Sequence, residues 1–203
     1  MGQYYRASIL KPNYKTTKDN IVSASISPYD FDNGAKLMEH SYINNEYVCA
    51  FMHMIQMLDK TNRGLICVWA GDYAGNIPGR KAHENETIFD DAYGADINVT
   101  NSELYDHLKE NPCVSYKYAI NRTKKEFVEI PEAQTGKSIV HPLPILLAFG
   151  NGLGLGDYHT KIGGKTKHNA QFVGTWAFDK ISVSNEIPNS NYKKIDWKIE
   201  EQI

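Results

Sequence analysis

Apolar and polar residues alternate in short blocks along the chain, and their spacing predicts the secondary structure. Residues 4–10 and 21–26 have the β-branched and aromatic content of strands. Residues 35–42 predict a short helix, and residues 44–58 place apolar side chains at three- and four-residue spacing, which predicts an amphipathic helix. Residues 65–70 form a wholly apolar run. That run predicts a buried strand that ends in an exposed loop.

The second half of the chain contains shorter segments of the same kinds. Residues 114–120 and 126–130 flank a polar turn and predict a β-hairpin, and residues 172–183 predict a last strand. A helix is expected from Thr100 or Asn101 to Leu108. Residues 143–149 are apolar throughout, and in so short a run periodicity does not distinguish a strand from a helix.

The order of these elements predicts the fold class. About six strands and about three helices follow one another without regular alternation, which favours an α+β fold with a mainly antiparallel sheet. The length of 203 residues favours one domain over residues 1–203. Residues 75–98 are acidic and polar and predict a long irregular loop, of the kind that serves as a binding loop or lid. Residues 185–203 predict a polar tail.

Composition narrows the setting in which the protein acts. The net charge is −2 and the basic residues are spread along the chain, so no basic face for duplex nucleic acid is expected. No run approaches the ~18–20 apolar residues that span a bilayer, and the chain begins without the pattern of a secretion signal. Cys49, Cys67 and Cys113 are far apart and odd in number, which is typical of reduced thiols. We therefore expect a cytoplasmic protein with no membrane partner.

The stretch 141–158 carries the most unusual pattern. An apolar run ends in four glycines at alternate positions, and an acidic, an aromatic and an imidazole side chain follow them: Gly150, Gly152, Gly154, Gly156, Asp157, Tyr158 and His159. Glycine adds nothing to a core and loses much backbone entropy on folding, so this pattern indicates tightly bent backbone or close approach by another molecule. The dinucleotide-binding fingerprint is not met, because Leu155 or Asp157 stands where its third glycine belongs. Two interpretations remain: an anion-binding concavity of exposed amides, or a structural turn packed against a neighbouring strand.

A second Gly-Asp-Tyr follows the apolar run at 65–70 and matches the one at the end of the glycine stretch. If the two runs are neighbours, the two carboxylates and the two tyrosines emerge at one rim. Paired carboxylates can do acid–base work, hold a divalent metal or accept hydrogen bonds from ribose hydroxyls, and the tyrosines can stack on a base or donate hydrogen bonds. The alternative is that each aspartate caps its own loop. The candidate ligand-binding residues are Asp72, Tyr73, His141, Gly150, Asn151, Gly152, Gly154, Gly156, Asp157, Tyr158 and His159.

The other motifs assign no metal, cofactor or catalytic residue. The seven histidines include no pair at helical i, i+4 spacing, and no Gly-x-Ser-x-Gly nucleophile elbow is present. His40 follows Glu39, so a general base oriented by a carboxylate is one interpretation of that pair, while His53 is expected in the core or at its boundary. Trp69 and Trp176 lie in apolar runs and are expected to anchor the core inside strands.

Several motifs together resemble a known group of proteins. The segments 1–5 (MGQYY), 37–42 (LMEHSY), 68–73 (VWAGDY) and 141–158 are similar to those of a family of small proteins from bacteriophages and gut-bacterial mobile elements, and 174–177 (GTWA) fits the same pattern. The family has no established activity, so the resemblance implies an origin and no catalytic residues. By analogy, we expect a phage-borne accessory protein of this size to be a counter-defence factor, and one way in which such factors act is to trap or cleave nucleotide immune signals.

Three functions follow from these observations. The preferred one is a non-catalytic sponge for a nucleotide-like ligand, supported by the glycine stretch and the supply of tyrosines. The second is inhibition of a host protein through residues 75–98. The third is a hydrolase or phosphodiesterase that uses Asp72, Asp157 and either His141 or His159. A homo-oligomer is compatible with each of them.

Overall fold

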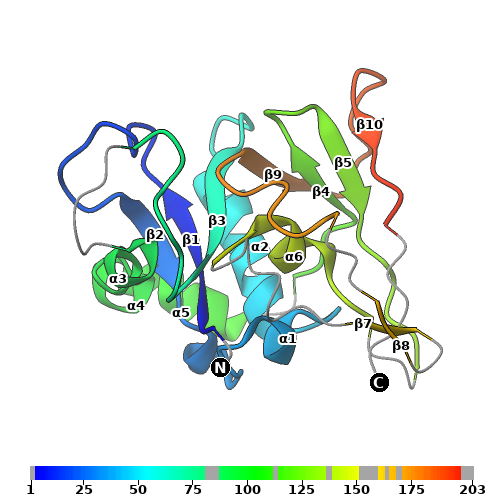
Figure 1. Cartoon of the computed structure of the whole chain (residues 1–203), viewed down its shortest axis with the longest axis horizontal. Helices are drawn as coiled ribbons and strands as arrows, with labels where there is room; N and C mark the ends of the chain where they lie inside the picture. Colours follow the sequence, from blue (N-terminus) through cyan, green and yellow to red (C-terminus); the bar gives the residue numbers. More distant parts are fainter. Residues whose placement is uncertain are drawn as a thin grey trace.

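The chain forms an α+β structure in which helices pack on a mixed β-sheet (Figure 1). The computed structural model describes residues 3–80, 87–111, 114–135, 139–150, 160–162, 165–167 and 171–197. No helix within these ranges is long and apolar enough to cross a membrane.

The main sheet of the described residues has eight strands in the order β10-β5-β4-β9-β3-β1-β2, with β6 paired to β3 off this path. Neighbours are antiparallel except for two parallel pairs, β10 with β5 and β6 with β3. A separate two-stranded sheet pairs β7 with β8. The strands are β1 Tyr5–Leu10, β2 Val22–Ile26, β3 Leu65–Gly71, β4 Tyr118–Asn121, β5 Glu126–Glu129, β6 Ala148–Phe149, β7 Thr160–Ile162, β8 Lys165–Lys167, β9 Lys180–Ser184 and β10 Lys193–Lys194.

Six α-helices occur in the part of the chain that the structure describes, together with one 3₁₀ turn, η1, at Pro28–Phe31. Most of them begin at a polar side chain that accepts a hydrogen bond from a first-turn amide, which satisfies one of the unpaired donors of a helix start. The helices are α1 Leu37–His40, α2 Glu46–Leu58, α3 Ile88–Tyr93, α4 Ile97–Thr100, α5 Ser102–Glu110 and α6 Pro142–Leu147.

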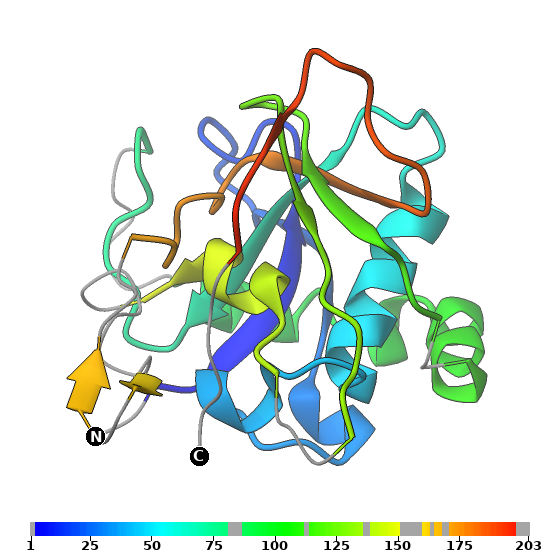
Figure 2. The same ribbon diagram turned by 90° about the vertical axis from the view of Figure 1, so that its right-hand side faces the viewer.

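Helix α2 carries the largest share of the core. Figure 2 shows it, in cyan, alongside the central strands. Tyr47 and Phe51 on α2 both meet Trp69 of β3 edge-to-face, with ring centroids 5.3 and 5.2 Å apart. The Tyr47 hydroxyl accepts a hydrogen bond from the Ala7 amide of β1 (2.7 Å) and donates one to the Ile26 carbonyl of β2 (3.3 Å). These contacts fix α2 against three strands at once.

The elements with a clear period in sequence are confirmed. The helix expected at 44–58 is α2, the run at 65–70 is β3, and the hairpin expected after residue 114 is β4–β5. Cys49 and Cys67 are buried and form no disulfide, and Cys113 lies outside the described residues. The α+β class is correct, but the described residues hold more strands and helices than the sequence predicts.

The strand expected at 172–183 is wrong over most of its length, because only β9 is extended. The Gly174 and Trp176 amides donate to the Ile145 and Leu146 carbonyls of α6, at 2.9 and 2.7 Å. Gly174 and Phe178 have φ of 71° and 70°, in the left-handed region that interrupts a strand. Trp176 is fully buried, as expected, but it lies in this turn and not in a strand.

The structure adds detail to three other segments. The ambiguous run at 143–149 is both: α6 ends at Leu147 and β6 follows at once. The segment 75–98 is not irregular throughout, because α3 and the start of α4 lie within it. The tail at 185–203 contains β10, which pairs in parallel with β5.

Candidate functional site

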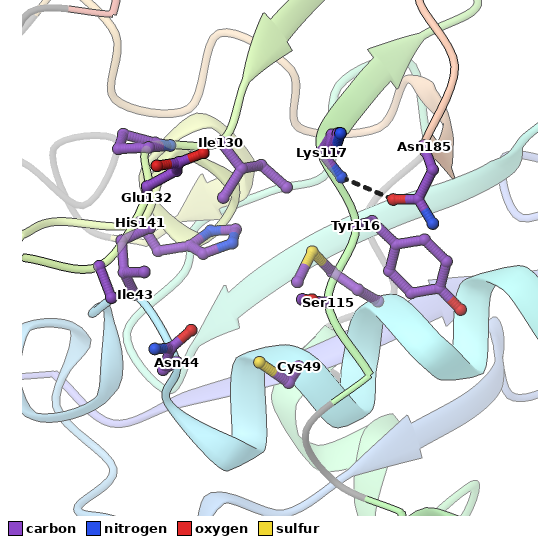
Figure 3. Close-up of a pocket in the computed structure, with 13 residues that line it drawn as sticks. Ile43, Asn44, Cys49, Ser115, Tyr116, Lys117, Ile130, Glu132, His141 and Asn185 are labelled. Carbon is purple, nitrogen blue, oxygen red and sulfur yellow. Dashed lines mark hydrogen bonds between the residues drawn. The ribbon is translucent and has the colours of Figure 1, made fainter.

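A cavity of about 580 Å³ opens between the start of α2, the two segments that flank the β4–β5 hairpin, and the start of α6 (Figure 3). Its volume lies in the range of small-molecule sites. The lining joins segments that are far apart in sequence: Ile43, Asn44, Cys49, Met52, Ser115, Tyr116, Lys117, Ile130, Pro131, Glu132, Ala133, His141 and Asn185.

His141 is held in the wall of this cavity by two hydrogen bonds. Its amide donates to the Ser41 carbonyl (3.0 Å), which ties it to the loop before α2. Its side-chain Nδ1 accepts a hydrogen bond from the Leu143 amide (3.1 Å) and thereby caps the N-terminus of α6. Pro142 occupies the first helical position, where a missing amide costs nothing. The sequence His-Pro-Leu therefore fixes the imidazole in one orientation.

The same geometry defines the protonation of the imidazole. Because Nδ1 accepts a hydrogen bond, the proton of the neutral ring is on Nε2. Burial lowers the pKa of His141 from 6.5 to about 3, so the ring is neutral at physiological pH. Only 1% of the residue is exposed, and Nε2 has no hydrogen-bond partner in the described part of the chain. The wall thus contains a buried N–H donor that has no partner among the described residues.

The rest of the cavity divides into a buried floor and an exposed mouth. Cys49 and Met52 of α2, like His141, are buried members of the lining, and these three residues form its floor. Tyr116 is half-buried, and burial raises the pKa of its hydroxyl. Asn44, with φ of 62°, is exposed at the turn before α2.

The mouth carries opposite charges on opposite sides. Glu132 lies on the same side of the cavity as His141, whereas Lys117 and Asn185 lie across from them (Figure 3). All three of these polar side chains are exposed. The Asn185 side-chain oxygen accepts a hydrogen bond from the Lys117 amide (3.1 Å), which leaves its amide nitrogen as a donor.

The sequence-predicted residues Asp72 and Tyr73 lie elsewhere. A carboxylate oxygen of Asp72 accepts a hydrogen bond from the Tyr4 amide (3.0 Å), and the Asp72 amide donates to the Tyr4 carbonyl (2.9 Å). This pair of bonds joins the residue after β3 to the residue before β1, and it is not the cap of its own loop that the structural alternative describes. The Tyr73 side chain is exposed.

Gly150 also has a structural role. Strands β3 and β6 are parallel neighbours, so the two apolar runs do lie side by side. A Cβ on Gly71 would stand 3.3 Å from the Gly150 Cα, and a Cβ on Gly150 would meet the Gln3 side chain and, at 2.9 Å, the Tyr5 hydroxyl. At this glycine the space is filled by the protein's own side chains, as the packing interpretation predicts.

The other candidate residues lie outside the described part of the chain: Asn151, Gly152, Gly154, Gly156, Asp157, Tyr158 and His159. Among the four described candidates, His141 lines the cavity, and Asp72, Tyr73 and Gly150 do not. No cluster of three or more His, Cys, Asp or Glu suited to a metal ion occurs among the described residues.

Of the residues that line the cavity, the sequence predicts only His141 as a ligand-binding residue. Cys49 and Met52 read as core positions of a helix, and Tyr116, Lys117, Glu132 and Asn185 stand in polar segments without a motif. Tyr116 and Lys117 directly precede β4 and Asn185 directly follows β9, but no signal in the sequence links them to Glu132 or to the two residues of α2.

Comparison of the chain with protein-family models, with curated proteins and with solved structures found no match.

Proposed function

We propose that this protein binds a small nucleotide-like ligand in the cavity walled by His141. The observation that carries the proposal is the Nε2–H of a buried imidazole, which has no partner among the described residues and belongs to a side chain in the lining of a cavity of about 580 Å³. A buried donor without an acceptor destabilises a fold by about 1–3 kcal/mol. A ligand acceptor at Nε2 recovers that free energy on binding.

The state of His141 supports binding and not proton abstraction. Its Nδ1 lone pair accepts the hydrogen bond from the Leu143 amide. Its pKa of about 3 keeps the ring neutral at physiological pH, with its single proton on Nε2. Such a group orients a ligand but does not remove a proton from it at neutral pH. Among the functions expected from the sequence, this favours sequestration of a nucleotide signal over its cleavage at this residue.

The lining supports a nucleotide-like ligand by its chemistry. The half-buried Tyr116 ring offers a surface for stacking, and the Asn44 and Asn185 amides can each donate and accept at the mouth. Lys117 supplies a cation for a phosphate. These groups match the base, sugar and phosphate of one ligand.

Calorimetry with the ribonucleosides, their 5′-monophosphates and cyclic dinucleotides tests the proposal. We expect at least one of these compounds to bind with a Kd of about 1 μM or tighter. Chromatography of the released ligand then shows it intact. A cleaved product instead supports the hydrolase, and no binding by any member overturns the proposal.

Two substitutions of His141 separate its two roles. His141→Asn keeps an acceptor near the Nδ1 position for the Leu143 amide but removes the donor at Nε2. His141→Gln places an amide N–H near the Nε2 position and loses the cap. We expect His141→Asn to weaken binding by about 5- to 100-fold, from the loss of one buried hydrogen bond, and His141→Gln to weaken it less. Tyr73→Ala, outside the cavity, is the control. Equal affinity of His141→Asn and the wild type contradicts the site.

A further inference from the structure

The floor of the His141 cavity is buried and uncharged. The buried members of the lining are His141, Cys49 and Met52, which offer one neutral N–H donor and two sulfur atoms. Moving an anion into such surroundings without a cation costs several kcal/mol. An uncharged acceptor has no such penalty, and sulfur makes favourable contacts with the edge of an aromatic ring. The floor therefore suits a flat heterocycle and disfavours a phosphate.

The charges of the mouth orient the rest of the ligand. Glu132 lies on the His141 side of the cavity and Lys117 on the opposite side, and both are exposed (Figure 3). Glu132 repels a phosphate from the vicinity of His141, while Lys117 attracts it to the far side of the mouth. Both effects act in the same direction.

We infer that a nucleotide enters this cavity base first. An uncharged ring acceptor, either a carbonyl oxygen or an unprotonated ring nitrogen, accepts the hydrogen bond from His141 Nε2–H, and the phosphate stays at the mouth beside Lys117. This inference rests on the proposed function and adds the part of the ligand that is recognised. The base supplies most of the affinity, and the phosphate adds little.

Calorimetry with matched probes tests this orientation on the full chain. The probes are each nucleoside, its 5′-monophosphate, ribose 5-phosphate and inorganic phosphate. We expect the nucleoside that corresponds to the best nucleotide to bind within about tenfold of it. We also expect ribose 5-phosphate and inorganic phosphate not to displace the nucleotide.

Lys117→Gln tests the position of the phosphate, with Lys60→Gln as a control that changes the net charge equally at an exposed lysine outside the cavity. Because an exposed ion pair contributes little, Lys117→Gln should weaken the binding of the monophosphate about two- to fivefold and leave the affinity for the nucleoside unchanged. Lys60→Gln should change neither.

The outcomes separate the inference from the proposed function. A nucleotide that binds while its nucleoside does not, and that ribose 5-phosphate displaces, overturns the base-first orientation and leaves the binding function standing. Equal affinity of the monophosphate for Lys117→Gln and the wild type overturns the position of the phosphate. Absence of binding by every nucleoside and nucleotide overturns both proposals.

Discussion

The indole Nε1–H of Trp69 donates a hydrogen bond of 2.8 Å to Nε2 of His40, and both residues are fully buried. With Nε2 accepting, the ring proton is on Nδ1, which donates to the Gly34 carbonyl at 2.9 Å. Both ring nitrogens are satisfied, and burial lowers the pKa of His40 to about 4. His40 is therefore a core residue that joins α1 to β3, and not a general base oriented by Glu39.

His40→Phe should destabilise the fold strongly. The phenyl ring fills most of the space but leaves the buried Trp69 N–H and the half-buried Gly34 carbonyl without their His40 partners. With about 1–3 kcal/mol for the buried N–H and a smaller cost for the half-buried carbonyl, the free energy of unfolding should fall by about 1–5 kcal/mol. Urea denaturation followed by circular dichroism measures it.

A double-mutant cycle with Trp69→Phe is the control for that prediction. The two residues share one hydrogen bond, so the double variant should lose about 0.5–3 kcal/mol less than the sum of the single variants. A coupling energy of zero would show that the bond between Trp69 and His40 adds nothing to stability.

The stability of the protein should fall as the pH is lowered below about 6.5. Folding lowers the pKa of His40 from 6.5 to about 4 and that of His141 to about 3, in both cases because the ring is buried. Between the unfolded and the folded pKa values, the unfolded chain therefore binds more protons than the folded chain. The contribution of each histidine to stability is fully present above the unfolded pKa and is lost as the pH falls towards the folded pKa. Each histidine contributes a slope of up to about 1.4 kcal/mol per pH unit.

Urea denaturation at about pH 7, pH 6 and pH 5 measures this slope. His40→Phe removes one of the two groups, so its slope should be lower than that of the wild type. A free energy of unfolding that stays constant over this range contradicts the neutral, buried state of both rings.

The local pattern of the sequence predicts the elements whose period is set by burial. Residues 44–58 and 65–70 show their helix and strand clearly, because one face of α2 and both faces of β3 pack in the core. The strand expected at 172–183 fails for a non-local reason. The carbonyls at the end of α6 capture the Gly174 and Trp176 amides, and nothing in the sequence around residue 174 reveals that contact.

The sequence likewise predicts one residue of the candidate site and not the others. His141 stands out because a polar residue before a proline begins an apolar run. Cys49, Tyr116 and Asn185 join it only because β4 lies between β5 and β9 and α2 packs beside them. That order of strands is set by long-range pairing, which the spacing of residues in one sequence does not encode.

Gly150→Ala should destabilise the fold, because Gly150 is a site of close packing. The new methyl group would collide with the Gln3 side chain and lie 2.9 Å from the Tyr5 hydroxyl, both of which belong to buried residues. Overpacking of this kind costs about 1–3 kcal/mol. Gly75→Ala is the matched control, because its Cβ would have no neighbour within 4 Å, and it should change stability by less than about 0.5 kcal/mol.

Chemical denaturation of the two glycine variants side by side measures the difference. Gln3→Ala combined with Gly150→Ala should recover part of the loss, since it removes the first obstacle to the methyl group. Wild-type stability for Gly150→Ala would mean that the space beside it is open, and would restore the interpretation that a ligand approaches this glycine.

The stability of the two His141 variants should follow the cap of α6 and not the cavity. His141→Gln removes the acceptor for the Leu143 amide, and loss of a helix cap costs about 0.5–2 kcal/mol. His141→Asn restores a preferred capping residue and removes only atoms that face the cavity, so it should unfold at a higher urea concentration than His141→Gln. The order of stability is then the reverse of the order of ligand affinity. Parallel orders in the two measurements would mean that His141 acts on the ligand only through the fold.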